Sequence, residues 1–149
     1  MKILFVCSEN IYRSSTGHII MQKIIDDNNL DWQVDSCGTS DFHGGEAPTI
    51  SIQKVAKKYG YDMSNLKSRQ ITKQDLDEFD IIFAMDTSHY NHIKEMGVDS
   101  KKLKMFLELT PEQGVDLSDR YYTKKEERVF KICINTCNKW YQELIKRNS

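Results

Sequence analysis

The sequence predicts an α/β fold in which a parallel sheet carries helices on both faces. Residues 3–6 and 81–85 are short and nearly all apolar, which is typical of strands buried on both faces of such a sheet. Segments with helical spacing of apolar residues follow these runs, and this alternation favours βαβ units with right-handed crossovers. The 149 residues suit one domain, and we expect a single domain over residues 1–149.

Each expected element has its own pattern. The first strand, residues 3–6, precedes a helix at 14–27, where isoleucines recur at helical spacing. Residues 32–36 predict a second strand, and a glycine-rich loop at 38–45 leads past Pro48 to a helix at Ile50–Lys58. Residues 81–85 predict a third strand, which a helix follows through His92, and 103–107 are a candidate fourth. A closing helix at 124–147 would bury Val129, Ile132, Cys133, Thr136 and Trp140.

Composition narrows the function classes. The formal net charge is −1, so no bulk attraction draws the chain to nucleic acid or to an anionic membrane, and we expect neither as a partner. The apolar run at 3–6 is too short for a signal peptide or a membrane span, which predicts a cytoplasmic protein, expected to be a monomer.

The cysteines of the chain show no C-x-x-C spacing and no neighbouring histidine cluster, which predicts free thiols and no metal site. They are Cys7, Cys37, Cys133 and Cys137.

The chemistry is expected where the first strand ends. Cys7 is followed six residues later by Arg13, across a strand-to-helix turn. The residues between them can curl so that their backbone N–H groups form an anion nest, and the helix N-terminus adds positive potential. Arg13 can hold two phosphate oxygens in a fork, and Ser14 can donate a hydrogen bond to a Cys7 thiolate. A cysteine at the end of a buried strand is often a plain core residue, but this placement favours a phosphate-binding nucleophile.

Wider motifs support this interpretation. The segment F-V-C-S-E-N-I-Y-R-S at 5–14 resembles the phosphate loop V-C-x-G-N-x-C-R-S-P of the low-molecular-weight protein tyrosine phosphatases. The resemblance continues, in family order, through D-S-C-G-T-S-D at 35–41, S-R-Q-I-T at 68–72, F-D at 79–80, A-M-D at 84–86 and D-R-Y-Y at 119–122. It implies a four-stranded parallel twisted sheet and hydrolysis of phosphotyrosine and aryl phosphate monoesters through a phosphocysteine. The substrate would be a phosphotyrosine-containing protein or a small aryl phosphate, the product inorganic phosphate, and no cofactor is implied.

The resemblance also assigns roles by motif position. Cys7 would attack phosphorus, Arg13 would stabilise the transferring phosphoryl group, and Asp119 would act as general acid and then base. Asn10 would shape the loop, since asparagine tolerates left-handed backbone. The other loop residues would be Ser8, Glu9, Ile11, Tyr12 and Ser14, and aromatic walls for the substrate ring would come from Phe42, Tyr121 and Tyr122.

Five positions depart from the family pattern. Glu9 stands where the family usually has glycine and brings a carboxylate to the loop, while Tyr12 replaces a cysteine that can protect the nucleophile from oxidation. Ser15 and Arg120 replace prolines, and Leu66 replaces a histidine of the supporting hydrogen-bond network.

Two alternatives follow from these observations. A weakly active or inactive domain that binds phosphotyrosine or phosphate would fit the changes at Glu9 and Leu66. An arsenate reductase would need two further relay cysteines, and residues 81–92 contain none. Cys133 and Cys137 share a helix face but are poorly spaced for a disulfide.

Overall fold

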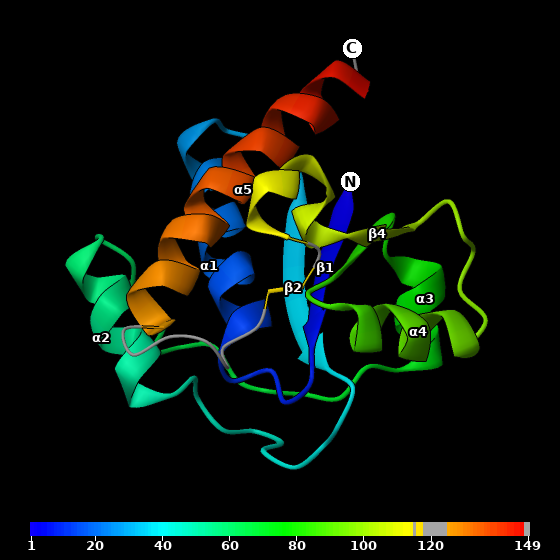
Figure 1. Cartoon of the computed structure of the whole chain (residues 1–149), viewed down its shortest axis with the longest axis horizontal. Helices are drawn as coiled ribbons and strands as arrows, with labels where there is room; N and C mark the ends of the chain where they lie inside the picture. The colour runs from blue at the N-terminus through cyan, green and yellow to red at the C-terminus, as the bar shows by residue number, and fades with distance from the viewer. Residues whose placement is uncertain (115, 118–124, 148–149) are drawn as a thin grey trace.

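The computed structural model describes residues 1–114, 116–117 and 125–147, and the elements alternate as the sequence predicts (Figure 1). The strands are β1 (Lys2–Cys7), β2 (Gln33–Gly38), β3 (Ile81–Ala84) and β4 (Leu103–Met105). The α-helices are α1 (Arg13–Asp27), α2 (Ile50–Lys58), α3 (Lys73–Glu78), α4 (Thr87–Glu95) and α5 (Lys125–Arg147). Two 3₁₀ turns, η1 (Phe106–Leu109) and η2 (Pro111–Gln113), follow β4.

The strands form one sheet in the order β2-β1-β3-β4, and every neighbouring pair is parallel. Val6 of β1 pairs with Cys37 of β2 on one side and with Ala84 of β3 on the other. The predicted four-stranded parallel sheet is confirmed. Because all strands point the same way, the chain segments that follow β1, β2 and β3 leave from one edge of the sheet, where parallel sheets bind ligands.

Each face of the sheet is covered by its own core. Ile3 and Phe5 of β1 pack with residues of α1, α2 and α5, whereas Leu4 and Val6 pack with residues of α3 and α4. Figure 1 shows α1, α2 and α5 on one side of the strands and α3 and α4 on the other. The alternation follows from the two-residue period of a strand, and it explains why residues 3–6 are apolar without interruption. The prediction of helices on both faces is confirmed.

The closing helix α5 also agrees with its predicted pattern. All five residues expected to point inward are buried, and the Trp140 indole N–H donates a 2.7 Å hydrogen bond to the Phe106 carbonyl. Thr136 hydrogen-bonds the buried Thr110 hydroxyl at 3.1 Å, which pairs its polar group. The helix is thereby fixed to η1 by side chains as well as by apolar packing.

Several elements differ from the sequence prediction; β3 ends at Ala84 rather than at residue 85, and α4 continues beyond His92 to Glu95. The second strand extends to Gly38, two residues beyond the predicted end, because it continues beside β1 as far as Cys7. The predicted strand at 103–107 ends at Met105, where η1 turns Phe106 into the core. Helix α3 was not predicted, since six residues show too little periodicity; its start carries a capping box between Thr72 and Asp75.

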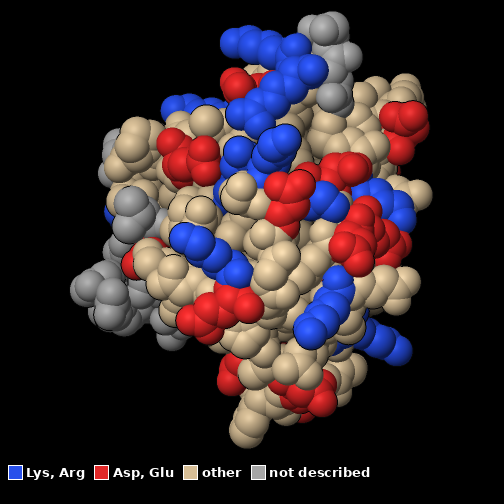
Figure 2. All heavy atoms as spheres, turned by 90° about the vertical axis from the view of Figure 1, so that its right-hand side faces the viewer, with Lys and Arg blue, Asp and Glu red and all other residues tan. Residues whose placement is uncertain are grey.

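The surface carries both signs of charge. On the face in Figure 2, which looks from the side of α3 and α4, basic and acidic side chains are interspersed. Several form pairs, such as Lys2 with Glu78 at 2.7 Å. In the described ranges, no helix has the length and apolar character needed to cross a membrane.

Candidate active site

The loop between β1 and α1 curls around the Cys7 thiol. The Asn10 backbone N–H points to Cys7 Sγ at 3.3 Å, and the Ser14 hydroxyl lies 2.9 Å from the same sulfur. Ser14 belongs to the first turn of α1, so the sulfur lies at the positive end of that helix. Both groups can donate a hydrogen bond to the sulfur. The structure therefore brings together Cys7, Asn10 and Ser14 as the sequence predicts.

Asn10 holds the shape of this loop. It is 2% exposed and has φ of 58°, the left-handed conformation predicted from its residue type. Its side-chain N–H donates to Ser14 Oγ at 2.8 Å, and its side-chain oxygen accepts from the Arg69 backbone N–H at 3.1 Å. With its own hydroxyl oxygen accepting from Asn10, Ser14 is oriented to donate its proton to Cys7.

Arg13 lies at the other end of the loop, at the first position of α1. Its Nη1 donates to Asp86 Oδ2 at 3.1 Å and to the Leu117 carbonyl at 2.7 Å. Burial opposes the charged form of Asp86, but hydrogen bonds from the Ser88 hydroxyl and the His89 backbone outweigh it and hold the pKa of Asp86 below its usual value. The Asp86 carboxylate, which lies just beyond the C-terminal end of β3, thus orients Arg13.

Arg69 forms further hydrogen bonds that support the loop from outside the cavity. Its guanidinium donates to Asp35 at 2.9 Å and to Asp75 at 2.8 Å, and its backbone N–H bonds to Asn10. The predicted S-R-Q block thus supports the loop from outside, through one arginine that joins β2, α3 and Asn10. Leu66, where the family pattern has histidine, packs at the edge of the core instead.

Gly38 allows β2 to lie directly against the loop. A Cβ atom at this position would lie 2.5 Å from the Ser8 carbonyl oxygen and 3.0 Å from the Glu9 carbonyl carbon. The residues that follow donate to the loop: the Thr39 N–H to the Cys7 carbonyl and the Ser40 N–H to the Ser8 carbonyl, both at 2.9 Å. Only glycine fits this approach without moving backbone.

We expect Gly38→Ala to lower kcat/KM by about 10-fold or more, because the clash displaces loop backbone that binds phosphate. Overpacking should also cost about 1–3 kcal/mol of stability. Steady-state activity against p-nitrophenyl phosphate measures the loss in kcat/KM, and thermal unfolding measures the loss of stability. Gly97→Ala is the control: Gly97 has φ of 93° with open space around it, so this variant loses stability but keeps kcat/KM. Unchanged kcat/KM in Gly38→Ala would contradict the account.

Glu9, which stands where the family pattern has glycine, contacts a histidine. Its carboxylate lies 3.4 Å from His43 Nε2, and the other ring nitrogen of His43 hydrogen-bonds Glu46. The Glu9 side chain is 44% exposed. His43 therefore lies between the carboxylates of Glu9 and Glu46 at the rim of the loop.

The loop residues line a cavity of 250 Å³ above Cys7. Residues 7–13 form one side, and among the other described residues Thr49, Ser51 and Glu126 also line it. None of these three was predicted from the sequence, because Thr49 caps α2, Ser51 and Glu126 belong to α2 and α5, and no motif marks them. A backbone bond from the Thr49 N–H to the Ile11 carbonyl, at 2.9 Å, explains how the start of α2 reaches the loop.

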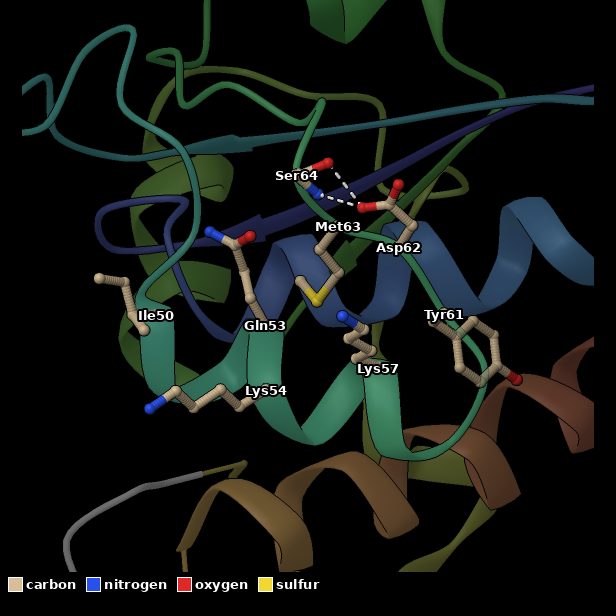
Figure 3. Close-up of a pocket in the computed structure, with 8 residues that line it drawn as sticks. All are labelled: Ile50, Gln53, Lys54, Lys57, Tyr61, Asp62, Met63 and Ser64. Carbon is tan, nitrogen blue, oxygen red and sulfur yellow. Dashed lines mark hydrogen bonds between the residues drawn. The ribbon is translucent and has the colours of Figure 1, made fainter.

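A second, larger cavity of 500 Å³ lies beside α2, and Ile50, the first residue of that helix, is part of its lining (Figure 3). Ile50, Gln53 and Lys57 line it from the helix, and Tyr61 and Met63 from the chain that follows. Figure 3 shows the Asp62 carboxylate bonded to Ser64 rather than to a lysine. No thiol lines this cavity among the described residues, so the nucleophilic chemistry belongs to the smaller one.

The predicted aromatic walls are placed only in part. Phe42 is 79% exposed, and its ring packs edge-on against His43, whose Nε2 lies 3.4 Å from the Glu9 carboxylate. It is not among the described residues that line the Cys7 cavity. Asp119, Arg120, Tyr121 and Tyr122 lie outside the described residues.

The other thiols are free and buried. Burial raises the pKa of Cys37, Cys133 and Cys137, which keeps them as neutral thiols. A disulfide relay requires thiolates, so these three cysteines do not suit arsenate reduction. In the described part of the chain, no group of three or more His, Cys, Asp or Glu side chains is placed to hold a metal ion.

Comparison with known proteins relates this chain to a family of phosphatases. The model of the low molecular weight phosphotyrosine protein phosphatase family matches residues 2–149. The human enzyme of that name is 32% identical over 95% of this chain and 94% of its own, and PtpA of Staphylococcus aureus is 32% identical over 97% and 94%. A protein tyrosine phosphatase from Entamoeba histolytica, solved with Hepes in its active site, superposes with a TM-score of 0.90 at 30% identity, covering 100% of this chain and 99% of that one. The chain therefore belongs to the low-molecular-weight phosphotyrosine protein phosphatase family and is a hydrolase of that class.

Proposed function

We propose that the chain hydrolyses phosphotyrosine and aryl phosphate monoesters in two steps, with Cys7 as nucleophile. The observation that carries this proposal is the convergence of the Asn10 N–H and the Ser14 hydroxyl on Cys7 Sγ at the start of α1. A thiolate at this position attacks phosphorus, the phosphorus–oxygen bond to the leaving group breaks, and a phosphocysteine forms. Water then attacks phosphorus, which releases inorganic phosphate and restores the thiolate.

Arg13 supplies positive charge at the transferring phosphoryl group. Within the described part of the chain, both hydrogen bonds from its guanidinium use Nη1, so the other N–H groups can donate to phosphate oxygens. The backbone N–H groups of residues 8–12 and the N-terminus of α1 add further donors. In this scheme the loop and Arg13 together neutralise the phosphate dianion, and the chemistry needs no metal.

Asp119 is proposed as the general acid that protonates the leaving phenolate and as the base that activates water in the second step. The support for this role is the D-R-Y-Y block at 119–122 together with the position of the preceding segment. Leu117 donates to the Met85 carbonyl and accepts from Arg13, and Asp116 accepts from Thr87. The chain two residues before Asp119 is thus fixed beside the phosphate loop.

We expect Asp119→Asn to reduce kcat for phenyl phosphate by about 100-fold or more, because phenolate is a poor leaving group without a proton donor. The loss should be smaller for p-nitrophenyl phosphate, whose leaving group needs less help. Steady-state kinetics at mildly acidic pH measure both. Asp116→Asn is the matched control, because that carboxylate accepts hydrogen bonds from Thr87 at the start of α4. A larger loss in Asp116→Asn than in Asp119→Asn would reassign the acid.

Selection for aryl groups is proposed to come from Phe42, Tyr121 and Tyr122 as walls of a slot above Cys7. Phe42 supports this through its position: its ring packs edge-on against His43, and His43 lies 3.4 Å from Glu9, which lines the cavity. Aromatic pairs contribute about 0.5–1.5 kcal/mol beyond area burial, which favours a flat ring over a serine side chain. The proposed substrates are therefore phosphotyrosine-containing proteins and small aryl phosphates.

A further inference from the structure

His89 is a buried histidine that bonds to the phosphate loop and has no role in the proposed reaction. It lies on the first turn of α4 and is 2% exposed. Its Nε2 lies 2.8 Å from the hydroxyl of Ser8, the residue directly after the nucleophile. Burying a polar ring costs free energy unless its groups are paired, so the contact with Ser8 is what compensates for placing His89 here.

The other ring nitrogen links His89 to Arg13. Nδ1 lies 3.0 Å from Asp86 Oδ1, close but without the alignment of a full hydrogen bond, and Asp86 Oδ2 accepts from Arg13 at 3.1 Å. A chain of contacts therefore runs from Ser8 through His89 and Asp86 to Arg13. It connects the two ends of the phosphate loop from outside the cavity.

Burial and the surrounding charges together set the protonation state of His89. Burial is the main reason that its pKa falls to about 4, with Arg13 and His92 acting in the same direction and Asp86 and Asp116 against it. The ring is thus neutral near neutral pH and carries one N–H. The Asp86 carboxylate beside Nδ1 favours the proton on that nitrogen, which leaves Nε2 to accept the Ser8 hydroxyl proton.

We propose that His89 is a positioning residue for the reaction, which sets the conformation of Ser8 and, through Asp86, the direction of Arg13. This inference rests on the proposed function of the loop. The Ser8 carbonyl is already fixed by the Ser40 N–H at 2.9 Å, and the bond to His89 fixes its side chain. With both groups held, the backbone N–H that follows Cys7 keeps one direction toward the phosphate oxygens. Small misplacements of such groups are costly in rate.

Four variants test the proposal: His89→Leu, His89→Gln, Ser8→Ala and the double variant His89→Leu/Ser8→Ala. We expect His89→Leu and Ser8→Ala each to lower kcat/KM for p-nitrophenyl phosphate by about 10-fold, and the double variant to lose no more than the worse single one. His89→Gln, whose amide can reach Ser8, should recover activity to within about 3-fold of wild type. The inhibition constant of inorganic phosphate should rise in the Leu and Ala variants and not in the Gln variant.

The outcomes separate this inference from the proposed function. Wild-type kcat/KM in Ser8→Ala or in folded His89→Leu would overturn the positioning role, as would losses that add in the double variant. If His89→Leu does not fold, the single variants Ser8→Ala and His89→Gln still test the positioning role. Cys7→Ser run in parallel reports on the function itself: turnover in Cys7→Ser refutes the nucleophile assignment, whatever the His89 variants show.

Discussion

Cys7→Ser is expected to reduce hydrolysis of p-nitrophenyl phosphate by at least about 10⁴-fold. Among the described residues, no general base contacts the side chain at position 7, so a serine hydroxyl there lacks activation. A thiolate needs none, and the Asn10 N–H and the Ser14 hydroxyl can donate hydrogen bonds to it. The loop itself should persist, since the Asn10–Ser14 and Asn10–Arg69 hydrogen bonds do not involve the sulfur. The variant should therefore bind inorganic phosphate while failing to turn over substrate.

Initial rates measure the loss of turnover, and calorimetric titration measures the retained binding of inorganic phosphate. Cys137→Ala is the matched control, because it removes a buried thiol on α5 whose sulfur lies 3.8 Å from the Gly17 carbonyl, outside the Cys7 cavity lining. It should lose some stability and keep its turnover. Residual activity of a few per cent in Cys7→Ser would show that another group attacks phosphorus.

Arg13→Ala is expected to lower kcat/KM by about 10³-fold or more. Arginines that neutralise a transferring phosphoryl group contribute effects of this size, and the backbone donors of the loop remain in the variant. Arg13→Lys should recover only part of the loss, since an ammonium group cannot grip two oxygens in a plane. Arg13→Ala also removes the ion pair with Asp86, so thermal unfolding must be measured beside the kinetics.

Arg147→Ala provides the comparison for a lost guanidinium, since Arg147 pairs with Glu143 at the far end of α5. It should match wild type in rate and phosphate affinity. If Arg13→Ala raised KM alone and left kcat unchanged, Arg13 would bind substrate without stabilising the transition state, and the proposed role would be wrong.

The sequence predicted most of the framework because its signals are local. Residues 3–6 are buried on both faces and so are continuously apolar, and Cys7, Arg13 and Ser14 are fixed relative to each other by one turn. The left-handed conformation of Asn10 was likewise predictable from its residue type.

The missed residues act across long sequence separations. Glu126 and Thr49 reach the cavity only because α5 and α2 pack on the same face of the sheet, and no motif marks either residue. His89 reads as an ordinary polar residue of an amphipathic helix, and only the parallel pairing of β1 with β3 brings it to Ser8. The short helix α3 carried a capping signal at Thr72 but too few residues for a periodic pattern.

The most direct test of the mechanism is to look for the covalent intermediate. The protein is mixed with p-nitrophenyl phosphate at mildly acidic pH, quenched in acid within milliseconds, digested and examined by mass spectrometry. The account predicts a phosphorylated peptide that contains Cys7, formed at the rate of the nitrophenolate burst and absent from Cys7→Ser. Phosphate release by the wild type with an unmodified Cys7 peptide at every quench time would mean direct attack by water, and it would contradict the central claim.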